Sequence, residues 1–145
     1  MIGRYRDGVV PEAEAPPELA AEFEGLVDAV RDRLDAVDPS AALDEIWRRV
    51  KRLNQYVQDE QPWQLAKDEG QAARLDSVLY GTAEGLRAVS VLLHPFLPTA
   101  TERLLGALGR EDLALEGAGF GASPGGARIG DLDQLFPRVE AEAPA

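Results

Sequence analysis

Apolar residues recur at three- and four-residue spacing along most of the chain, and this period predicts helices. The clearest apolar stripe lies within residues 42–70 and comprises Leu43, Ile46, Val50, Leu53 and Val57. Asp38-Pro39 suits the start of this helix, because an Asp oxygen can accept its free amide hydrogens and Pro fits the first position. Pro62 disfavours helical geometry in the residue before it, so we expect the helix to end between Gln58 and Gln61.

Three further helices are expected on either side of this one. A single helix over residues 18–37 has helical spacing at Leu19, Phe23, Leu26, Val30, Leu34 and Val37. A long helix begins near Gln71, and its second half is apolar nearly all round, which predicts burial on several sides. Gly81 and Gly85 let a neighbouring helix come close to it, or are tolerated glycines without consequence. Pro95 and Pro98 end that helix and start a last one, which Gly109 closes as a left-handed cap.

The pattern divides the chain into four parts. Residues 1–16 read as the end of a helix and a loop, and residues 17–109 as the core of the bundle. Residues 110–127 are rich in Gly and predict a mobile linker. Residues 128–145 provide apolar contacts that bring the chain back onto the bundle, followed by the solvated tail EAEAPA. The fold class expected is therefore all-α, an antiparallel helical bundle with a short extended C-terminal segment.

Two features of the central helix suggest binding. Trp63 follows Pro62 at the bend, where an indole can plug the joint between helices or offer a flat face to an unstacked base. Burial is the more frequent fate of tryptophans. The side opposite the apolar stripe carries a basic cluster, Arg48, Arg49, Lys51 and Arg52. This cluster forms either a phosphate-binding face or a salt-bridged surface with Asp44 and Glu45.

Four blocks of sequence carry a resemblance to a known family. They are RYRDGVVP at 4–11, LNQYVQDEQPWQLAKD at 53–68, RLDSVLYGTAEGLRAVSVLLHPFLPTATERL at 74–104 and IGDLDQLFPRVE at 129–140. In this order, the blocks resemble the C-terminal anticodon-binding domain of bacterial methionyl-tRNA synthetases, which are class I aminoacyl-tRNA synthetases. The first block looks like the end of that domain's first helix and the following loop.

The resemblance implies a helical bundle that recognises the CAU anticodon of methionine tRNAs. Trp63, next to Pro62, falls on the position whose indole stacks against the anticodon, and Arg4 best matches a basic residue that approaches the anticodon loop. Arg48 and Arg52 are further candidates for RNA contacts. The Asn and Arg that the family places earlier in the first helix have no counterpart, because the chain begins too late. Gln58 also departs from the acidic residue that the family often has.

Composition limits these interpretations. The chain has 145 residues with 26 acids against 15 bases, a net charge of −11. Affinity for phosphate comes mainly from Lys and Arg, so RNA binding requires that the acids lie away from the basic cluster. The absence of cysteine excludes disulfides and thiolate metal sites. The single histidine, His94, lacks partners in any catalytic or metal-binding pattern, so we expect it to pack or cap where a helix breaks.

Catalysis is not expected from this segment. The chain lacks the HIGH and KMSKS signatures of class I synthetases and shows no alternation of strands and helices. The resemblance therefore implies no catalytic residue, metal or cofactor here, with ATP and methionine bound only by a catalytic domain of the same or another chain. No signal-peptide core or apolar run of membrane-spanning length is present, so a cytoplasmic location with no membrane or DNA partner is expected.

Three hypotheses follow. The chain is the anticodon-binding region of a methionine-tRNA ligase and binds the anticodon loop of tRNA(Met). Alternatively, it is a stand-alone tRNA-binding module or synthetase paralogue, or an acidic helical bundle that binds protein. A basic surface around Trp63 favours the first two hypotheses, and an apolar or acidic surface favours the third.

Overall fold

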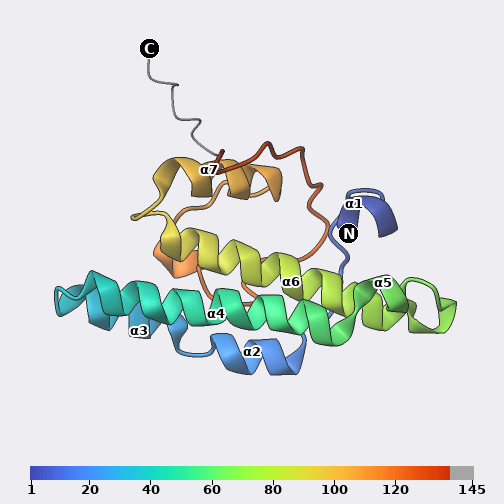
Figure 1. Cartoon of the computed structure of the whole chain (residues 1–145), viewed down its shortest axis with the longest axis horizontal. Coiled ribbons are helices and arrows are strands. Elements are labelled where there is room, and N and C mark those ends of the chain that lie inside the picture. Colours follow the sequence, from blue (N-terminus) through green and yellow to red (C-terminus); the bar gives the residue numbers. More distant parts are fainter. Residues whose placement is uncertain (138–145) are drawn as a thin grey trace, which may run out of the picture.

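Two antiparallel helices of 22 residues, α4 (Pro39–Glu60) and α6 (Ala72–Leu93), form the frame of the molecule (Figure 1). The computed structural model describes residues 1–137. The Asp38 carboxylate accepts a hydrogen bond from the amide of Ala41 at 3.0 Å, as expected of an N-terminal cap. Helix α4 ends before Gln61, whose φ of 46° is left-handed. Both predicted ends of this helix are confirmed.

The expected single helix over 18–37 is two helices, α2 (Pro17–Phe23) and α3 (Leu26–Asp35). The chain breaks at Gly25, which has a φ of 75° that glycine adopts without a steric cost. The apolar period continues across the break, so both helices bury residues against the bundle. The prediction fails at its far end, because Leu34 and Val37 are 38% and 85% exposed.

Helix α6 lies at the centre and is buried over most of its length. A Cβ atom on Gly81 would lie 2.7 Å from the Pro16 ring, and one on Gly85 would lie 2.5 Å from a methyl carbon of Leu53. The two glycines therefore allow close packing, as one of the two interpretations predicted.

Helix α7 (Pro98–Ala107) follows the break at Pro95 and packs on α6. His94 Nδ1 lies 2.9 Å from Thr101 Oγ1, so the histidine joins the two helices, in keeping with a packing role. Gly109 has a φ of 71°, and the amide of Arg110 donates to the carbonyl of Leu105 at 2.9 Å, which caps α7 as expected.

The Gly-rich segment 110–127 is attached to the bundle and is not a free linker. It contains a 3₁₀ turn at Leu115–Gly117. The buried Arg87 guanidinium donates to the carbonyls of Gly117 and Gly119 at 2.6 and 2.8 Å. The Glu84 carboxylate accepts from the amide of Gly121 at 2.9 Å. Composition suggested mobility because it does not reveal these partners, which lie 30 or more residues away along the chain.

The end of the described chain returns to its start. Val9 and Arg128 form an isolated antiparallel bridge, and Gly130 donates from its amide to the Ala107 carbonyl at 2.7 Å. Residues 1–137 are otherwise helices, turns and irregular segments, which confirms the all-α class. The predicted tail EAEAPA lies outside the described residues. No helix in the described part of the chain is long and apolar enough to cross a membrane.

Candidate nucleic-acid interface

The bend after α4 holds Trp63 at the surface. Helix α5 (Pro62–Leu65) begins immediately after the left-handed Gln61. Pro62 is fully buried, whereas Trp63 is 37% exposed. The indole is therefore not a core plug, and part of it is open to a ligand. Pro62 acts as a support that fixes the direction of the indole, because a buried ring offers no surface for a direct RNA contact.

Arg4 lies at the same end of the molecule as Trp63. It belongs to α1 (Ile2–Tyr5), which is joined to the first turns of α6 by an ion pair between Arg6 and Asp76. Helix α5 also packs on α6, and Figure 1 shows α1 and α5 together at one end of the frame. Arg4 is exposed, and its guanidinium lies 5.8 Å from the centre of the Tyr5 ring. No ion pair involves Arg4 in the described residues.

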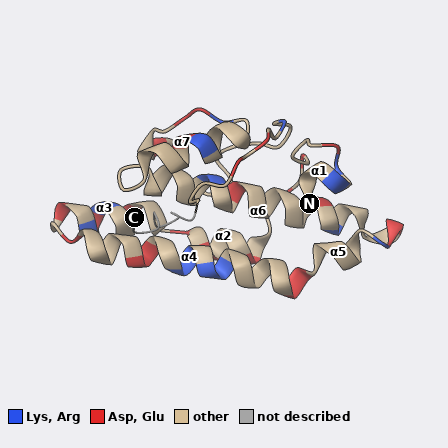
Figure 2. Cartoon of the chain, turned by 45° about the horizontal axis from the view of Figure 1, so that its top comes forward, with Lys and Arg blue, Asp and Glu red and all other residues tan. Residues whose placement is uncertain are grey.

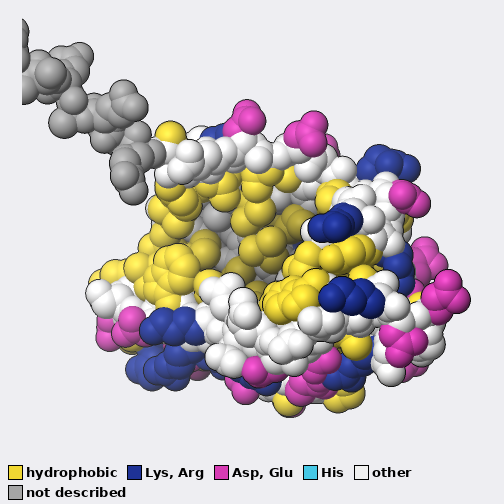
Figure 3. Space-filling model, turned by 45° about the vertical axis from the view of Figure 1, so that its right-hand side comes forward, with side chains coloured by type: hydrophobic (Ala, Val, Ile, Leu, Met, Phe, Trp, Pro, Cys, Tyr) yellow, Lys and Arg dark blue, Asp and Glu magenta, His cyan; other side chains and the backbone are white. Residues whose placement is uncertain are grey.

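Lys67 is a cation at this end that the sequence analysis did not single out. It is exposed one turn after Trp63, and its ammonium donates to the side-chain oxygen of Gln64 at 3.1 Å. Within the described residues it forms no ion pair, and an amide oxygen does not neutralise its charge. Its spacing of four residues from Trp63 was visible in the sequence. Figure 3 shows two basic side chains standing over apolar surface on this side of the molecule.

Arg74, at the start of α6, has acidic partners. Its guanidinium donates to the two Glu60 oxygens at 2.9 and 2.5 Å and lies 3.5 Å from Glu18. The hydrogen bond with Glu60 raises the pKa of Arg74 above its ordinary value. Arg74 is thus bound within the protein, which leaves Arg4 and Lys67 as the cations available near the indole.

A comparison with known protein families identifies the family of this chain. The family model described as the anticodon binding domain of methionyl tRNA ligase matches residues 7–143. The chain belongs to this family. Methionine–tRNA ligase of Caldanaerobacter subterraneus subsp. tengcongensis is 38% identical over 148 residues, with 98% of this chain and 23% of the relative covered. Methionine–tRNA ligase of Deinococcus radiodurans is 39% identical over 150 residues, with 99% of this chain and 22% of the relative covered.

Solved structures agree with the family and the fold. The apo form of Mycobacterium tuberculosis methionyl-tRNA synthetase superimposes with a TM-score of 0.82 at 29% identity, over 97% of this chain and 30% of that one. This anticodon-binding domain thus spans less than a quarter of the length of the curated relatives named above. The helical bundle inferred from sequence is confirmed as that of methionyl-tRNA synthetases.

Most of the basic cluster on α4 of this anticodon-binding domain forms ion pairs with acidic side chains. Glu45 lies 2.8 Å from Arg49 and 3.6 Å from Arg48, and Arg52 lies 3.6 Å from Glu22 on α2. The salt-bridged interpretation is therefore observed for the three arginines of the cluster, with Glu45 as the partner of both Arg48 and Arg49. The expected pair between Asp44 and Arg48 is not formed, and Lys51 has no ion pair in the described residues. Arg48 and Arg52 also lie roughly 18 and 12 Å before the end of α4, at 1.5 Å per residue. Figure 2 shows the cluster at mid-helix, away from α1 and α5.

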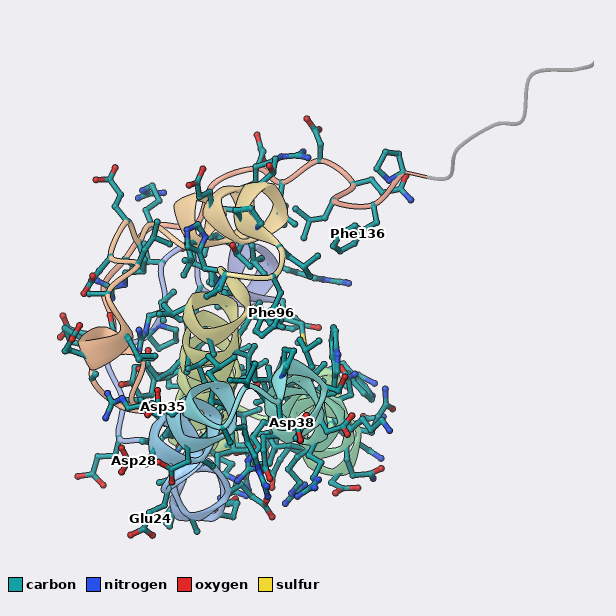
Figure 4. The ribbon with its side chains drawn as sticks, turned by 90° about the vertical axis from the view of Figure 1, so that its left-hand side faces the viewer. Glu24, Asp28, Asp35, Asp38, Phe96 and Phe136 are labelled. Carbon is teal, nitrogen blue, oxygen red and sulfur yellow. The ribbon has the colours of Figure 1, made fainter. Side chains whose placement is uncertain are left out.

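Charge is only partly segregated. At the end opposite Trp63, Figure 4 shows four carboxylates on and between α2, α3 and α4: Glu24, Asp28, Asp35 and Asp38. Acids also lie near the indole, including Glu60 and Asp68. Within the described residues, no group of three or more His, Cys, Asp or Glu side chains is placed to hold a metal ion.

A second tryptophan, Trp47, is also exposed. It lies on α4, four turns before Trp63 in the sequence, and is 43% exposed. The sequence analysis did not consider it, because Trp47 adjoins the core residue Ile46 without a proline or bend to mark it. The two indoles have similar exposure but lie in different surroundings, which makes Trp47 a matched control for Trp63.

Proposed function

We propose that this chain binds the anticodon loop of methionine tRNAs and reads the CAU anticodon. The observation that carries the proposal is an indole held 37% exposed by a buried proline, at the end of the molecule that also bears Arg4 and Lys67. A base stacked on Trp63 contributes roughly 1–3 kcal/mol. The two cations contact the phosphates on either side of that base and position the loop.

Stacking gives affinity but little discrimination, since every base has a flat face. Hydrogen bonds to the edges of splayed bases must therefore supply the choice of CAU. Gln64 lies beside Trp63 and is exposed, although its side-chain oxygen already accepts from Lys67. The described residues around Trp63 thus provide a stacking face and two cations, and only a few groups able to read base edges.

The role of this binding is to position tRNA(Met) for aminoacylation by a catalytic domain of the same or another chain. Family membership and the limited share of the relatives that the chain spans support this role. ATP and methionine act in that catalytic domain. The part proposed for this chain is to hold the anticodon loop while the acceptor end of the tRNA reaches the catalytic centre.

The pair Trp63→Ala and Trp47→Ala tests the proposal. We predict that Trp63→Ala weakens binding of a CAU anticodon stem-loop by more than about tenfold, which corresponds to the loss of one base stack. Trp47→Ala should change the Kd by less than about twofold. The measurement is a filter-binding titration at low salt, with circular dichroism to show that both variants keep the helicity of the parent. Equal effects of the two substitutions, or unfolding of Trp63→Ala alone, would remove Trp63 from the binding surface.

A further inference from the structure

Trp63 follows a strained point of the backbone. Gln61, two residues earlier, has a φ of 46°, a left-handed value that is rare for a residue with a side chain. A residue that precedes proline ordinarily takes an extended conformation, so Pro62 makes this geometry less favourable still. The carbonyl of Gln61 accepts from the amides of Gln64 and Leu65 at 2.7 and 3.2 Å, and these bonds begin α5. The conformation of Gln61 therefore sets the direction of the helix that carries Trp63.

An arginine from α6 supports this strained backbone. Strained conformations persist only where neighbouring contacts hold them. After Gln61, the support is the burial of Pro62. Before it, Glu60 at the end of α4 accepts two hydrogen bonds from the Arg74 guanidinium, at 2.9 and 2.5 Å. Arg74 belongs to the first turn of α6 and also lies 3.5 Å from Glu18 on α2. One side chain thus joins three helices directly beside the strained residue.

The contact between Arg74 and Glu60 is suited to fixing a direction. Two parallel hydrogen bonds to one carboxylate restrain rotation as well as distance, whereas a lysine would supply a single point charge. The Glu60 side chain is only 19% exposed, so water competes little for its oxygens. Residues 61–71 connect α4 to α6, and the contact closes this connection at its base. Closure reduces the number of conformations open to the bend, and with it the motion of Trp63.

We propose that Arg74 is a positioning residue for RNA binding, which holds the bend at Gln61 through Glu60 and so presents the Trp63 indole to a base. Because this role rests on the proposed binding of the anticodon loop, it gives a function to a cation that acids withhold from phosphate. Arg74 itself does not contact the RNA. An indole that is already ordered loses less conformational freedom on binding, and ordering one such side chain weakens binding by about three- to tenfold.

The test breaks the contact from each side in a Trp47→Phe background, where Trp63 is the only indole. The variants are Arg74→Met and Glu60→Gln. Arg31→Met is the control, because the Arg31 and Arg74 side chains are 47% and 45% exposed and each pairs with an acid. Time-resolved fluorescence anisotropy of the free protein measures the motion of the indole, and circular dichroism shows that each variant is folded. Arg74→Met and Glu60→Gln should each increase the fast, nanosecond part of the depolarisation, and Arg31→Met should not.

The same variants are then titrated with an anticodon stem-loop that bears CAU. Arg74→Met should raise the Kd by about three- to tenfold. The slope of log K against log salt should stay as in the parent, because no phosphate contact is lost. Glu60→Gln should act in the same direction, and the double variant should bind no more weakly than Arg74→Met alone. Arg31→Met should bind as the parent does.

Three results would overturn the proposal. The first is an indole as restrained in Arg74→Met as in the parent, whatever happens to RNA binding. The second is a fall of the salt slope by about 0.7 in Arg74→Met, which would make Arg74 a direct phosphate contact. The third is a loosened indole with an unchanged Kd. Trp63→Ala then separates two causes: weakened binding would reject the positioning role alone, and parent-like binding would reject stacking on Trp63 itself.

Discussion

Individual side chains at the Trp63 end divide into those available to a ligand and those used by the protein. Arg74 is held by Glu60 and Glu18, whereas Arg4 and Lys67 have no acidic partner among the described residues. Arg48 and Arg52, which the sequence offered as further candidates, have carboxylates within 3.6 Å. In the proposed interface, the neighbours of each cation therefore decide whether it is available to a phosphate, and the charge of the side chain alone does not.

Arg4 and Arg48 should differ in the salt dependence of RNA binding. Each phosphate that a side chain neutralises contributes about 0.7 to the slope of log K against log salt for single strands. We predict that Arg4→Gln reduces this slope by about 0.7 and weakens binding at low salt. Arg48→Gln should leave the slope nearly unchanged, because Arg48 is paired with Glu45 and far from the indole. Kd values for the anticodon stem-loop at four salt concentrations measure both slopes; an unchanged slope for Arg4→Gln would exclude Arg4 from the interface.

Two buried tyrosines on the frame differ in whether their hydroxyls are satisfied. The Tyr80 hydroxyl donates to the Ser123 carbonyl at 2.8 Å, whereas the Tyr56 hydroxyl is buried without a hydrogen-bond partner in the described residues. Burial, with smaller contributions from Glu60 and Glu18, raises the pKa of Tyr56 to about 12. A phenol whose pKa is higher in the folded than in the unfolded state stabilises the fold below the unfolded value of 10, and this contribution is lost as the pH rises toward 12.

Tyr56→Phe should therefore be tolerated at neutral pH and protective at high pH. At pH 7 we expect no loss of unfolding free energy, because the substitution removes an unsatisfied polar group, whereas Tyr80→Phe should lose about 1 kcal/mol. Between pH 10 and 12 the parent should lose on the order of 2 kcal/mol more stability than Tyr56→Phe. Urea unfolding of the three proteins at pH 7, 10 and 11.5 gives these values. Parallel losses in parent and variant would show that Tyr56 ionises as it does in the unfolded chain.

At the scale of helices and loops, the sequence predicted the helix limits that follow from the apolar period and from the positions of proline and glycine. The limits of α4, the break at Pro95 and the glycine cap of α7 were predicted because each depends on residues adjacent in sequence. The break between α2 and α3 was missed, since Phe23 and Leu26 keep the helical period across Gly25 and both are buried. Only the conformation of Gly25 separates the two helices, and the apolar pattern is insensitive to it.

The Gly-rich segment shows the other limit, because its order depends on partners distant in sequence. Glu84 and Arg87 are a buried ion pair, 2.7 Å apart, whose side chains are 3% and 7% exposed. Both also bond to backbone groups of residues 117–123. The segment then leads to residues 126–129, whose amides and carbonyls pair with residues 8–10. The pair on α6 thus helps to place the loop that follows α1, and with it the helix that carries Arg4.

Breaking this pair should be costly. Glu84→Gln leaves the Arg87 charge buried without its partner, and we predict a loss of about 3–5 kcal/mol of unfolding free energy. Asp28 and Arg31 form a pair with the same three-residue spacing, but their side chains are 78% and 47% exposed, so Asp28→Asn should cost less than about 0.5 kcal/mol. Chemical denaturation compares the two. Combining Glu84→Gln with Arg87→Met should recover part of the loss, and a purely additive result would show that the two side chains do not act as a pair.

For the whole molecule, a net charge of −11 opposes association with RNA. With Arg4 and Lys67 as the cations available near Trp63 among the described residues, the slope of log K against log salt should be only about −1.4. Affinity must then depend on stacking and on contacts to base edges more than on phosphate.

The family and the helical bundle could be predicted from sequence, because four motifs spread over the chain resemble those of the family. Which cations are available was accessible only in part. Arg48 and Arg49 pair with Glu45 on the same helix, as their spacing allows, whereas Arg52 and Arg74 are paired by acids on other helices.

The most direct test of the account is a fluorescence titration at low salt in a Trp47→Phe background, where Trp63 is the only indole. The chain is titrated with an anticodon stem-loop that bears CAU and with the same loop changed at the first anticodon base. The account predicts quenching of Trp63 by both loops, with clearly tighter binding of the CAU loop. Equal, weak binding of the two loops without quenching would contradict it, and would show that this bundle has the family fold without the ability to read the anticodon.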